Sequence, residues 1–486
     1  MQNELTAEGI IQNESLLWEK GGKGKSAFSL PRRDVERAPL DDELIGEGPD
    51  FPDLAEVEIV RHYTRLSQWN FGLDTGMYPL GSCTMKYNPK TNDRQAAVEG
   101  LASAHPLLPQ EYAQGSLKIL YELEKELEEI TGMDAVSLQP AAGAQGELAG
   151  MLIFDAYHKS RGSKRTRILI PDTAHGTNPA SAALCGYQPI SIKSGPEGIL
   201  TSEAVAELMD EETAGIMITN PNTLGLFEEN IKEIADIIHK KGGLVYADGA
   251  NMNAIMGIVR PGDIGADVMH LNLHKTFSTP HGGGGPGAGP VCVKEHLAKF
   301  LPVPRIEKKG DQYFLVEDQP DSIGKLHAFY GNFGVLIRAY SYIKSMGADG
   351  LKKASSYAVL NANYIKENLK EDYYLPYDKP CMHECVFSDK IQKETSDIMT
   401  LDIAKRLMDY GFHPPTIYFP LIVSGAMMIE PTETESKDDI DRLIKVFKVI
   451  AKEAEENPEL LKQSPQKCRT RRLDEVTAAR KPCLIG

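Results

Sequence analysis

The spacing of hydrophobic positions changes twice along the chain. Residues 1–115 are rich in proline, glycine and charge and show little periodicity, so we expect an N-terminal arm there. From residue 116, Leu117, Leu120 and Leu123 recur at three-residue spacing and mark one face of a helix. Short apolar strands then alternate with helices up to residue 334: Ala135–Leu138, Arg167–Ile170, Pro189–Ile192, Gly215–Thr219, Leu244–Ala247 and Val268–Leu271. This alternation predicts a large α/β domain with a mostly parallel, doubly wound sheet.

The helices support this division. Glu228–Lys241 has apolar residues on one face, acids at its start and lysines at its end, as the helix dipole favours. From residue 335 to 486 the pattern predicts a smaller α+β domain with a polar tail. Its expected elements are helices at Tyr340–Ser345, Ala354–Glu371, Asp402–Tyr410 and Asp438–Glu455 and a strand at Met427–Glu430.

Composition narrows the classes of partner and compartment. The formal net charge of the 486 residues is -16, and such an acidic surface repels nucleic acid backbones and anionic lipids. We find no run of eighteen apolar residues and no basic, apolar signal segment at the start. Seven scattered cysteines suit free thiols in a reducing compartment. We therefore expect a cytoplasmic protein with neither nucleic acid nor membrane partners.

One short segment contains residue types that can bind a metal. Cys381, His383 and Cys385 lie within five residues, but they also fit a strand with alternating faces. No second group with metal-ligand spacing lies nearby in the sequence. We expect no metal site.

The segment HLNLHKTF carries the most informative residue, Lys275. Lys275 follows a predicted strand, and ligand sites of open parallel sheets lie at the carboxyl ends of strands. A solvated surface lysine is the ordinary alternative. Asp248, at the end of another predicted strand, favours the ligand site over the surface lysine. One strand–helix–strand step would bring Asp248 and Lys275 to the same sheet edge. Pyridoxal phosphate chemistry requires two such groups. One is a lysine whose amine attacks the aldehyde of the cofactor, and the other is a carboxylate beside its pyridine nitrogen.

Three further polar clusters follow predicted strands. Small residues around Ala144 and Gln145 open a helix, where backbone N–H groups can approach a phosphate. His175 lies where its ring could stack on a flat cofactor, and the amides of Asn220 and Asn222 could bind a ring hydroxyl. Each cluster alone is more often turn chemistry. Together, at five strand ends, they predict one site.

A glycine run follows Lys275 and formally satisfies a dinucleotide-binding pattern through Gly282, Gly284 and Gly287. That pattern needs a strand before it and a helix within it. Here a lysine loop precedes it, Pro286 interrupts it and the strand-like Val291–Val293 follows. We therefore reject a nicotinamide cofactor.

Several long segments resemble one protein family. They are DTGMYPLGSCTMKYNPK at 74–90, LQPAAGAQGE at 138–147, DTAHGTNPAS at 172–181, TNPNTLGLFE at 219–228, YADGANMNAI at 246–255, HLNLHKTF at 270–277, FYGNF at 329–333, and GFHPPTIYFPLI with EPTETE at 411–435. With them the chain resembles the lysine-bearing subunit 2 family of two-subunit glycine dehydrogenases (decarboxylating), the P-proteins of the glycine cleavage system.

The resemblance implies the fold, the cofactor and the site residues. The fold is that of the aspartate aminotransferase-like, fold type I enzymes that use pyridoxal 5'-phosphate. Lys275 is implied as the lysine that bonds to the cofactor, Asp248 as the partner of the pyridinium nitrogen and His175 as the stacking and catalytic ring. The other expected cofactor-binding residues are Ala144, Gln145, Asn220, Ala250 and His274. For the substrate side we expect Tyr78, Thr84 and His327.

The resemblance also implies a reaction and partners. Glycine is decarboxylated, and its aminomethyl group passes to the lipoyl arm of H-protein. Subunit 2 works with a related, lysine-free subunit 1 in an α2β2 assembly. Two other interpretations stay open: a different reaction of a fold type I enzyme, such as aminotransfer or side-chain cleavage, or a scaffold subunit without catalysis.

Overall fold

The computed structural model describes residues 14–22, 24–26, 29, 31–48, 51–105, 108–282 and 287–484. The chain divides into two units, Met1–Gly76 and Met77–Gly486. Residues 77–115, which the hydrophobic pattern groups with the arm, therefore belong to the second unit.

The first unit contains one long helix, α1 (Glu56–Gln68). The carboxylate of Glu14 accepts hydrogen bonds from Nδ1 of His62 and Nη1 of Arg65, both at 2.9 Å. These contacts attach the start of the described chain to α1.

The second unit is built around a seven-stranded sheet with the order β1-β7-β6-β5-β4-β2-β3. Strands β2 to β6 run parallel, and β7 pairs antiparallel with both β1 and β6. The strands are β1 Ala135–Ser137, β2 Arg167–Pro171, β3 Gln188–Ile192, β4 Thr213–Thr219, β5 Leu244–Gly249, β6 Val268–Leu271 and β7 Val291–Val293. The prediction of a mostly parallel sheet is confirmed.

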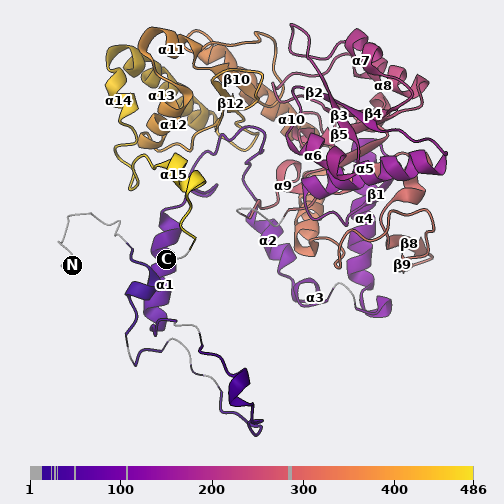
Figure 1. Cartoon of the computed structure of the whole chain (residues 1–486), viewed down its shortest axis with the longest axis horizontal. Helices are drawn as coiled ribbons and strands as arrows, with labels where there is room; N and C mark the ends of the chain where they lie inside the picture. The colour runs from indigo at the N-terminus through magenta and orange to yellow at the C-terminus, as the bar shows by residue number, and fades with distance from the viewer. Residues whose placement is uncertain are drawn as a thin grey trace. The chain divides into compact units, whose positions relative to one another are not determined.

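Helices cover both faces of this sheet (Figure 1). Helices α5 (Gly143–Ser160) and α6 (Thr177–Leu184) pack on the face to which Met217, Tyr246 and Val268 point. Helices α7 (Ser202–Leu208) and α8 (Ile231–Lys240) pack on the other face, as do α4 (Gln114–Thr131) and the first half of α10 (Phe333–Leu369). Alternate strand residues therefore enter different cores, as the two-residue repeat of a strand requires.

Two helix boundaries illustrate where local patterns succeed and fail. Helix α4 ends at Gly132, whose φ of 71° is a left-handed conformation that suits glycine. Helix α8 begins at Ile231, and the predicted start at Glu228 is wrong. The buried Glu228 carboxylate instead accepts hydrogen bonds from the backbone N–H of Leu200 and the amide of Asn222. Glu228 therefore connects two loops by hydrogen bonds and does not begin the helix.

A second, smaller core lies around the antiparallel sheet β10-β12-β11: Cys385–Ser388, Ala426–Ile429 and Thr416–Ile417. The predicted helices Tyr340–Ser345 and Ala354–Glu371 are parts of α10, which Gly347 interrupts with φ 61° and ψ 177°. The helices beside this sheet and in the tail are α11 Lys390–Ser396, α12 Thr400–Asp409, α13 Lys437–Glu456, α14 Pro458–Lys462 and α15 Glu475–Arg480. The remaining elements are α2 Lys90–Ala96, α3 Glu99–Ala102, α9 Leu273–Thr276, β8 Arg305–Lys309 and β9 Gln312–Val316.

Two expectations from composition concern the whole chain. None of the described helices combines the length and the apolar composition that crossing a bilayer requires. Among the described residues, six cysteines are free thiols: Cys83, Cys185, Cys292, Cys381, Cys385 and Cys468.

Helix α4 contains a buried acid whose ionisation opposes folding. Burial raises the pKa of Glu124 from 4.5 to about 8; Glu128 adds to the rise and Arg305 opposes it. Oε1 of Glu124 has no hydrogen-bond partner among the described residues. Because the folded pKa exceeds the unfolded one, the stability that the protonated acid contributes is complete below pH 4.5 and is lost as the pH rises through 8.

We therefore predict that Glu124→Gln changes the pH dependence of stability. The Tm of the variant minus that of the wild type should increase by at least about 2 °C between pH 5 and pH 9. Glu129→Gln on the same helix is the control, since the Glu129 side chain is 81% exposed and its Tm difference should stay constant. Parallel Tm curves for Glu124→Gln and wild type would contradict this explanation.

Candidate active site

The carboxyl ends of three neighbouring strands bring three polar residues together. Thr219 pairs with Asp248 between β4 and β5, and Asp248 pairs with His270 between β5 and β6. On their strands they lie two residues after Met217, Tyr246 and Val268, respectively. All three therefore point to the face that α5 covers. The sheet register alone therefore places a carboxylate between a hydroxyl and an imidazole.

Lys275 reaches the same edge from the next element. Strand β6 ends at Leu271, and the short helix α9 carries His274 and Lys275 immediately after it. Within the described part of the chain, no hydrogen bond or salt bridge engages Nζ of Lys275. The amine is therefore available to a ligand.

The start of α5 closes the site from above the sheet. Gly143 and Ala144 form its first turn, and a Cβ atom on Gly143 would lie 2.3 Å from Nδ2 of Asn272. A larger residue at this position would therefore have to displace the buried Asn272 side chain. The first turn of this 18-residue helix lines the site, and the backbone N–H groups at the start of a helix can bind an anion.

These elements enclose a cavity of about 200 Å³. Its walls come from β4, β5, β6, α5, α6 and α9 and from the loops that follow the strands. The lining residues are Ser82, Gly143, Ala144, Glu147, His175, Thr177, Thr219, Thr223, Asp248, Ala250, Asn251, His270, Asn272, His274 and Lys275. The structure thus brings together Lys275, Asp248, His175, Ala144, Ala250 and His274 of the residues expected from sequence.

Asp248 is buried and is held ionised by its neighbours. Burial alone would raise its pKa, but the His270 ring, 3.6 Å away, the N–H of Ala250 at 2.9 Å and the amide of Asn178 at 3.1 Å lower it below the usual value. The positive charge of Lys275 acts in the same direction. A fixed negative charge therefore faces the cavity close to a lysine.

Two histidines beside Lys275 are kept neutral. The pKa of His274 is lowered to about 3 and that of His281 to about 4, mainly by burial and with a contribution from the positive charge of Lys275. Their rings meet edge to face at 5.3 Å. Because both rings are neutral, Lys275 is the residue of these three that carries a positive charge.

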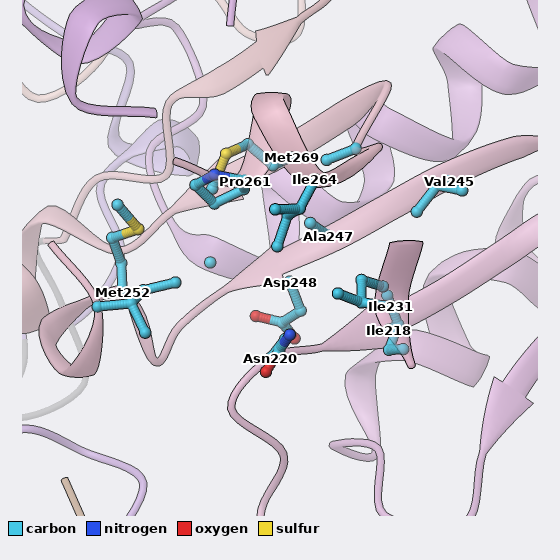
Figure 2. A pocket seen from close by; sticks show the side chains of 13 residues that line it. Ile218, Asn220, Ile231, Val245, Ala247, Asp248, Met252, Pro261, Ile264 and Met269 are labelled. Atoms are coloured by element: carbon cyan, nitrogen blue, oxygen red, sulfur yellow. The ribbon is translucent and has the colours of Figure 1, made fainter. Parts of the chain in front are cut away.

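Asp248 also borders a second, apolar cavity of about 20 Å³, roughly the room of one water molecule. In Figure 2 the labelled side chains around it are apolar except for those of Asp248 and Asn220. Ile218, Val245 and Met269 belong to the opposite sheet face from Tyr246 and Val268. Asn220 lines this second cavity, and its Oδ1 accepts from the N–H of Glu228. Thr219 and Thr223 line the main cavity instead.

The other expected residues do not line the main cavity. Oε1 of Gln145 accepts from the N–H of Ala141 at 2.7 Å, and Nε2 of His327 contacts the carbonyl of Gln139 at 2.7 Å. The Tyr78 ring stacks on that of His413 with centroids 3.8 Å apart. That these residues bind the cofactor or the substrate remains a prediction, and their positions outside the cavity lining do not support it.

Thr84 is buried against an acid of the smaller domain. Its N–H and Oγ1 bind the Glu430 carboxylate at 2.8 and 2.5 Å, and the N–H of Ser82 binds Glu384 at 2.8 Å. Ser82 and Thr84 have φ values of 63° and 46°, which are unfavourable for non-glycine residues. The two carboxylates therefore hold a strained segment whose Ser82 lines the cavity.

In the folded structure His383 has other neighbours than the two cysteines that lie close to it in the sequence. His383 groups with Glu384 and Glu430, whose potential ligand atoms lie within 4.8 Å, while the described structure contains no such group of His383 with Cys381 or Cys385. Burial raises the pKa of the Cys381 thiol to about 12, which disfavours the thiolate that metals bind. The motif therefore does not supply a Cys–His ligand set.

The residues around the cavity that were not predicted from the sequence include Glu147, Thr177, Asn178 and His270. Glu147 lies four residues after Gly143, one helical turn along the same face, so the helical repeat offered a signal. His270 shares its strand face with Val268, but only the pairing of β5 with β6 shows that it meets Asp248. That pairing is a tertiary fact.

Comparisons with known proteins agree with this site. Residues 99–309 match the family model "Glycine cleavage system P-protein", and residues 354–467 match "Glycine dehydrogenase, C-terminal domain". The chain is 60% identical over 481 residues to the probable glycine dehydrogenase (decarboxylating) subunit 2 of Caldanaerobacter subterraneus, covering 98% of this chain and 99% of the relative. The chain belongs to the glycine dehydrogenase (decarboxylating) subunit 2 family.

Other members and solved structures extend the comparison. The probable subunit 2 of Alkaliphilus oremlandii is 56% identical, covering 96% of each chain. A crystal structure of the glycine decarboxylase P-protein, inhibitor-bound, matches with a TM-score of 0.72 at 19% identity, covering 85% of this chain and 93% of that one. A cysteine desulfurase from Thermococcus onnurineus matches with a TM-score of 0.62 at 15% identity, covering 78% and 95%. This subunit 2 chain therefore has the predicted fold type I architecture.

Proposed function

We propose that this chain is the lysine-bearing subunit of a two-subunit P-protein that decarboxylates glycine with pyridoxal 5'-phosphate. In the same proposal, the aminomethyl group passes to the lipoyl arm of H-protein. One observation carries it: Lys275 and the ionised Asp248 line one cavity at the carboxyl edge of a parallel sheet. The names of the curated relatives supply glycine as the substrate and imply a subunit 1 partner.

The residues of the cavity fit this cofactor. The first turn of α5 offers backbone N–H groups for a phosphate, and Lys275 offers an amine for the aldehyde. Oγ1 of Thr219 and Oδ1 of Asn251 are buried without a hydrogen-bond partner among the described residues. Unsatisfied polar atoms in a cavity wall indicate that a polar ligand completes the site.

When bound, pyridoxal phosphate supplies an electron sink for the carbon that loses carbon dioxide. Asp248, held ionised, stabilises a proton on the ring nitrogen and so maintains that sink. The ring of His175 stands at the mouth of the cavity, where it can cover one face of a flat ligand. Orientation of the substrate carboxylate by such walls can lower a barrier by several kcal/mol, about 7 at best.

Glycine-dependent exchange of labelled bicarbonate tests this function. The chain is combined with its subunit 1, lipoylated H-protein and pyridoxal phosphate, and incorporation of label into the glycine carboxyl group is measured. We expect exchange that requires all components and a long-wavelength absorbance that disappears on borohydride reduction.

The test separates the two other candidate functions. A yellow, borohydride-sensitive protein without bicarbonate exchange would indicate a different pyridoxal phosphate reaction. A colourless chain that pyridoxal phosphate cannot reconstitute would indicate a scaffold. The presence of Lys275 in the cavity favours catalysis over the scaffold.

A further inference from the structure

A buried carboxylate, Glu147, links the two cofactor-facing residues His175 and Asp248. Its Oε1 accepts a hydrogen bond from Oγ1 of Thr177 at 2.8 Å, and its Oε2 accepts from Nδ2 of Asn178 at 2.8 Å. Thr177 contacts Nδ1 of His175 at 2.9 Å, and Asn178 donates to Oδ2 of Asp248 at 3.1 Å. One side chain on α5, 4% exposed, therefore anchors contacts to both residues.

The direction of these hydrogen bonds determines where the protons lie. Burial and the nearby charge of Asp248 raise the pKa of Glu147, while the hydrogen bonds from Asn178 and Thr177 lower it. In its ionised form the carboxylate only accepts, so the single hydroxyl proton of Thr177 points to Glu147. Oγ1 of Thr177 must then accept from His175, which places the ring proton on Nδ1. The backbone N–H of Thr177 also approaches Nδ1, and it favours the opposite tautomer, but its 3.4 Å separation is much weaker than the 2.9 Å contact.

We propose that Glu147 is a positioning residue that holds His175, through Thr177, as the tautomer protonated on Nδ1. Nε2 of His175 is then the unprotonated ring nitrogen, a hydrogen-bond acceptor at the mouth of the cavity. The inference rests on the proposed function, in which that ring covers the cofactor. It deepens that function because an acceptor at this point can bind the ammonium or hydroxyl protons of cofactor and substrate.

The rest of the site is consistent with a neutral, oriented ring. Partial burial lowers the pKa of His175, and the positive charge of Lys275 acts in the same direction. A second imidazole, His270, is oriented by its own partners, with the Tyr246 hydroxyl at 2.6 Å from Nδ1 and Oδ1 of Asn272 at 2.8 Å from Nε2. Of these two rings, His175 is the one that Glu147 orients.

The test measures the tautomer directly, without substrate. The full-length chain is produced with 15N-labelled histidine, and long-range proton–nitrogen correlation NMR gives the protonation of each ring nitrogen. His175→Gln identifies the His175 signal. We expect the Nδ1-protonated pattern in the wild type and in Thr177→Ser, which keeps the hydroxyl. In Thr177→Val, which removes it, we expect a mixture of tautomers.

Kinetics with subunit 1 and H-protein provide the second readout. In Thr177→Val, kcat should fall about tenfold or more with a nearly unchanged KM for glycine and unchanged cofactor content, and Thr177→Ser should restore kcat. Glu147→Gln should give the reversed tautomer, because its amide can donate to Thr177, which then donates to Nδ1. The Thr177 pair keeps the inference testable if Glu147→Gln fails to fold.

Two results would overturn the inference. One is an Nε2-protonated ring in the wild type, which would mean that Glu147 is protonated and the chain of donors runs the other way. The other is a tautomer that Thr177→Val leaves unchanged. Failure of bicarbonate exchange with the expected tautomer would refute the proposed function alone, so the two failures are distinguishable.

Discussion

Lys275→Ala is expected to abolish glycine-dependent bicarbonate exchange and the borohydride-sensitive absorbance while the fold persists. Lys275 is the amine that α9 presents to the cavity, and no hydrogen bond or salt bridge within the described chain depends on Nζ. Its removal therefore deletes the covalent attachment of the cofactor without breaking a structural contact. We expect a rate loss of at least about 1000-fold, the scale of deleting a reacting group.

The measurement compares exchange rates, absorbance spectra and Tm values of the variant and the wild type. Lys159→Ala is the matched control, because Lys159 is a lysine on α5 whose side chain is 75% exposed and pairs with Asp155 on the same helix. It should keep both activity and colour. Undiminished exchange in Lys275→Ala would refute the assignment of the lysine.

Asp248→Asn should reduce the exchange rate by about 100- to 1000-fold, even when pyridoxal phosphate still binds. The substitution keeps the shape of the side chain and its acceptor for the Ala250 N–H, but it removes the negative charge. Without that charge the ring nitrogen loses its proton and the electron sink weakens. The Asn178 amide also loses its acceptor at Oδ2, which adds a buried unsatisfied contact.

The diagnostic readout for Asp248→Asn is the rate at saturating pyridoxal phosphate and glycine, together with cofactor content and Tm. Asp236→Asn on the exposed face of α8 is the control and should leave all of these unchanged. A variant that binds the cofactor and retains the wild-type rate would show that Asp248 does not support the electron sink.

The polar clusters at strand ends were informative because they mark chain reversals at one edge of the sheet. Lys275 and Asp248 could be linked from their positions in the chain, since parallel strands end on the same side. The same reasoning could not tell which neighbour of a turn faces the cavity. Asn220 was expected to bind the cofactor, yet Thr219 lines the main cavity and Asn220 lines the apolar one behind it. A shift of one residue along a strand reverses the face.

Contacts between distant segments were the second limit. Thr84 and Glu430 are 346 residues apart in the chain and meet only because the fold brings the end of β12 to the segment 82–84. Cys381, His383 and Cys385 were expected to form a strand and no metal site, and nothing in their spacing indicated that His383 lies with Glu384 and the distant Glu430. Sequence distance carries no information on such pairs.

The sequence by itself determined the alternation of strands and helices, the parallel sheet and the side of that sheet on which a lysine and an aspartate meet. It could do so because side-chain periodicity and strand direction are local properties of the chain. Only the tertiary structure decided the strand register that sets Thr219, Asp248 and His270 side by side, and the packing of α5 that brings Glu147 to His175 through Thr177. Those proximities depend on how separate elements pack, which local patterns do not encode.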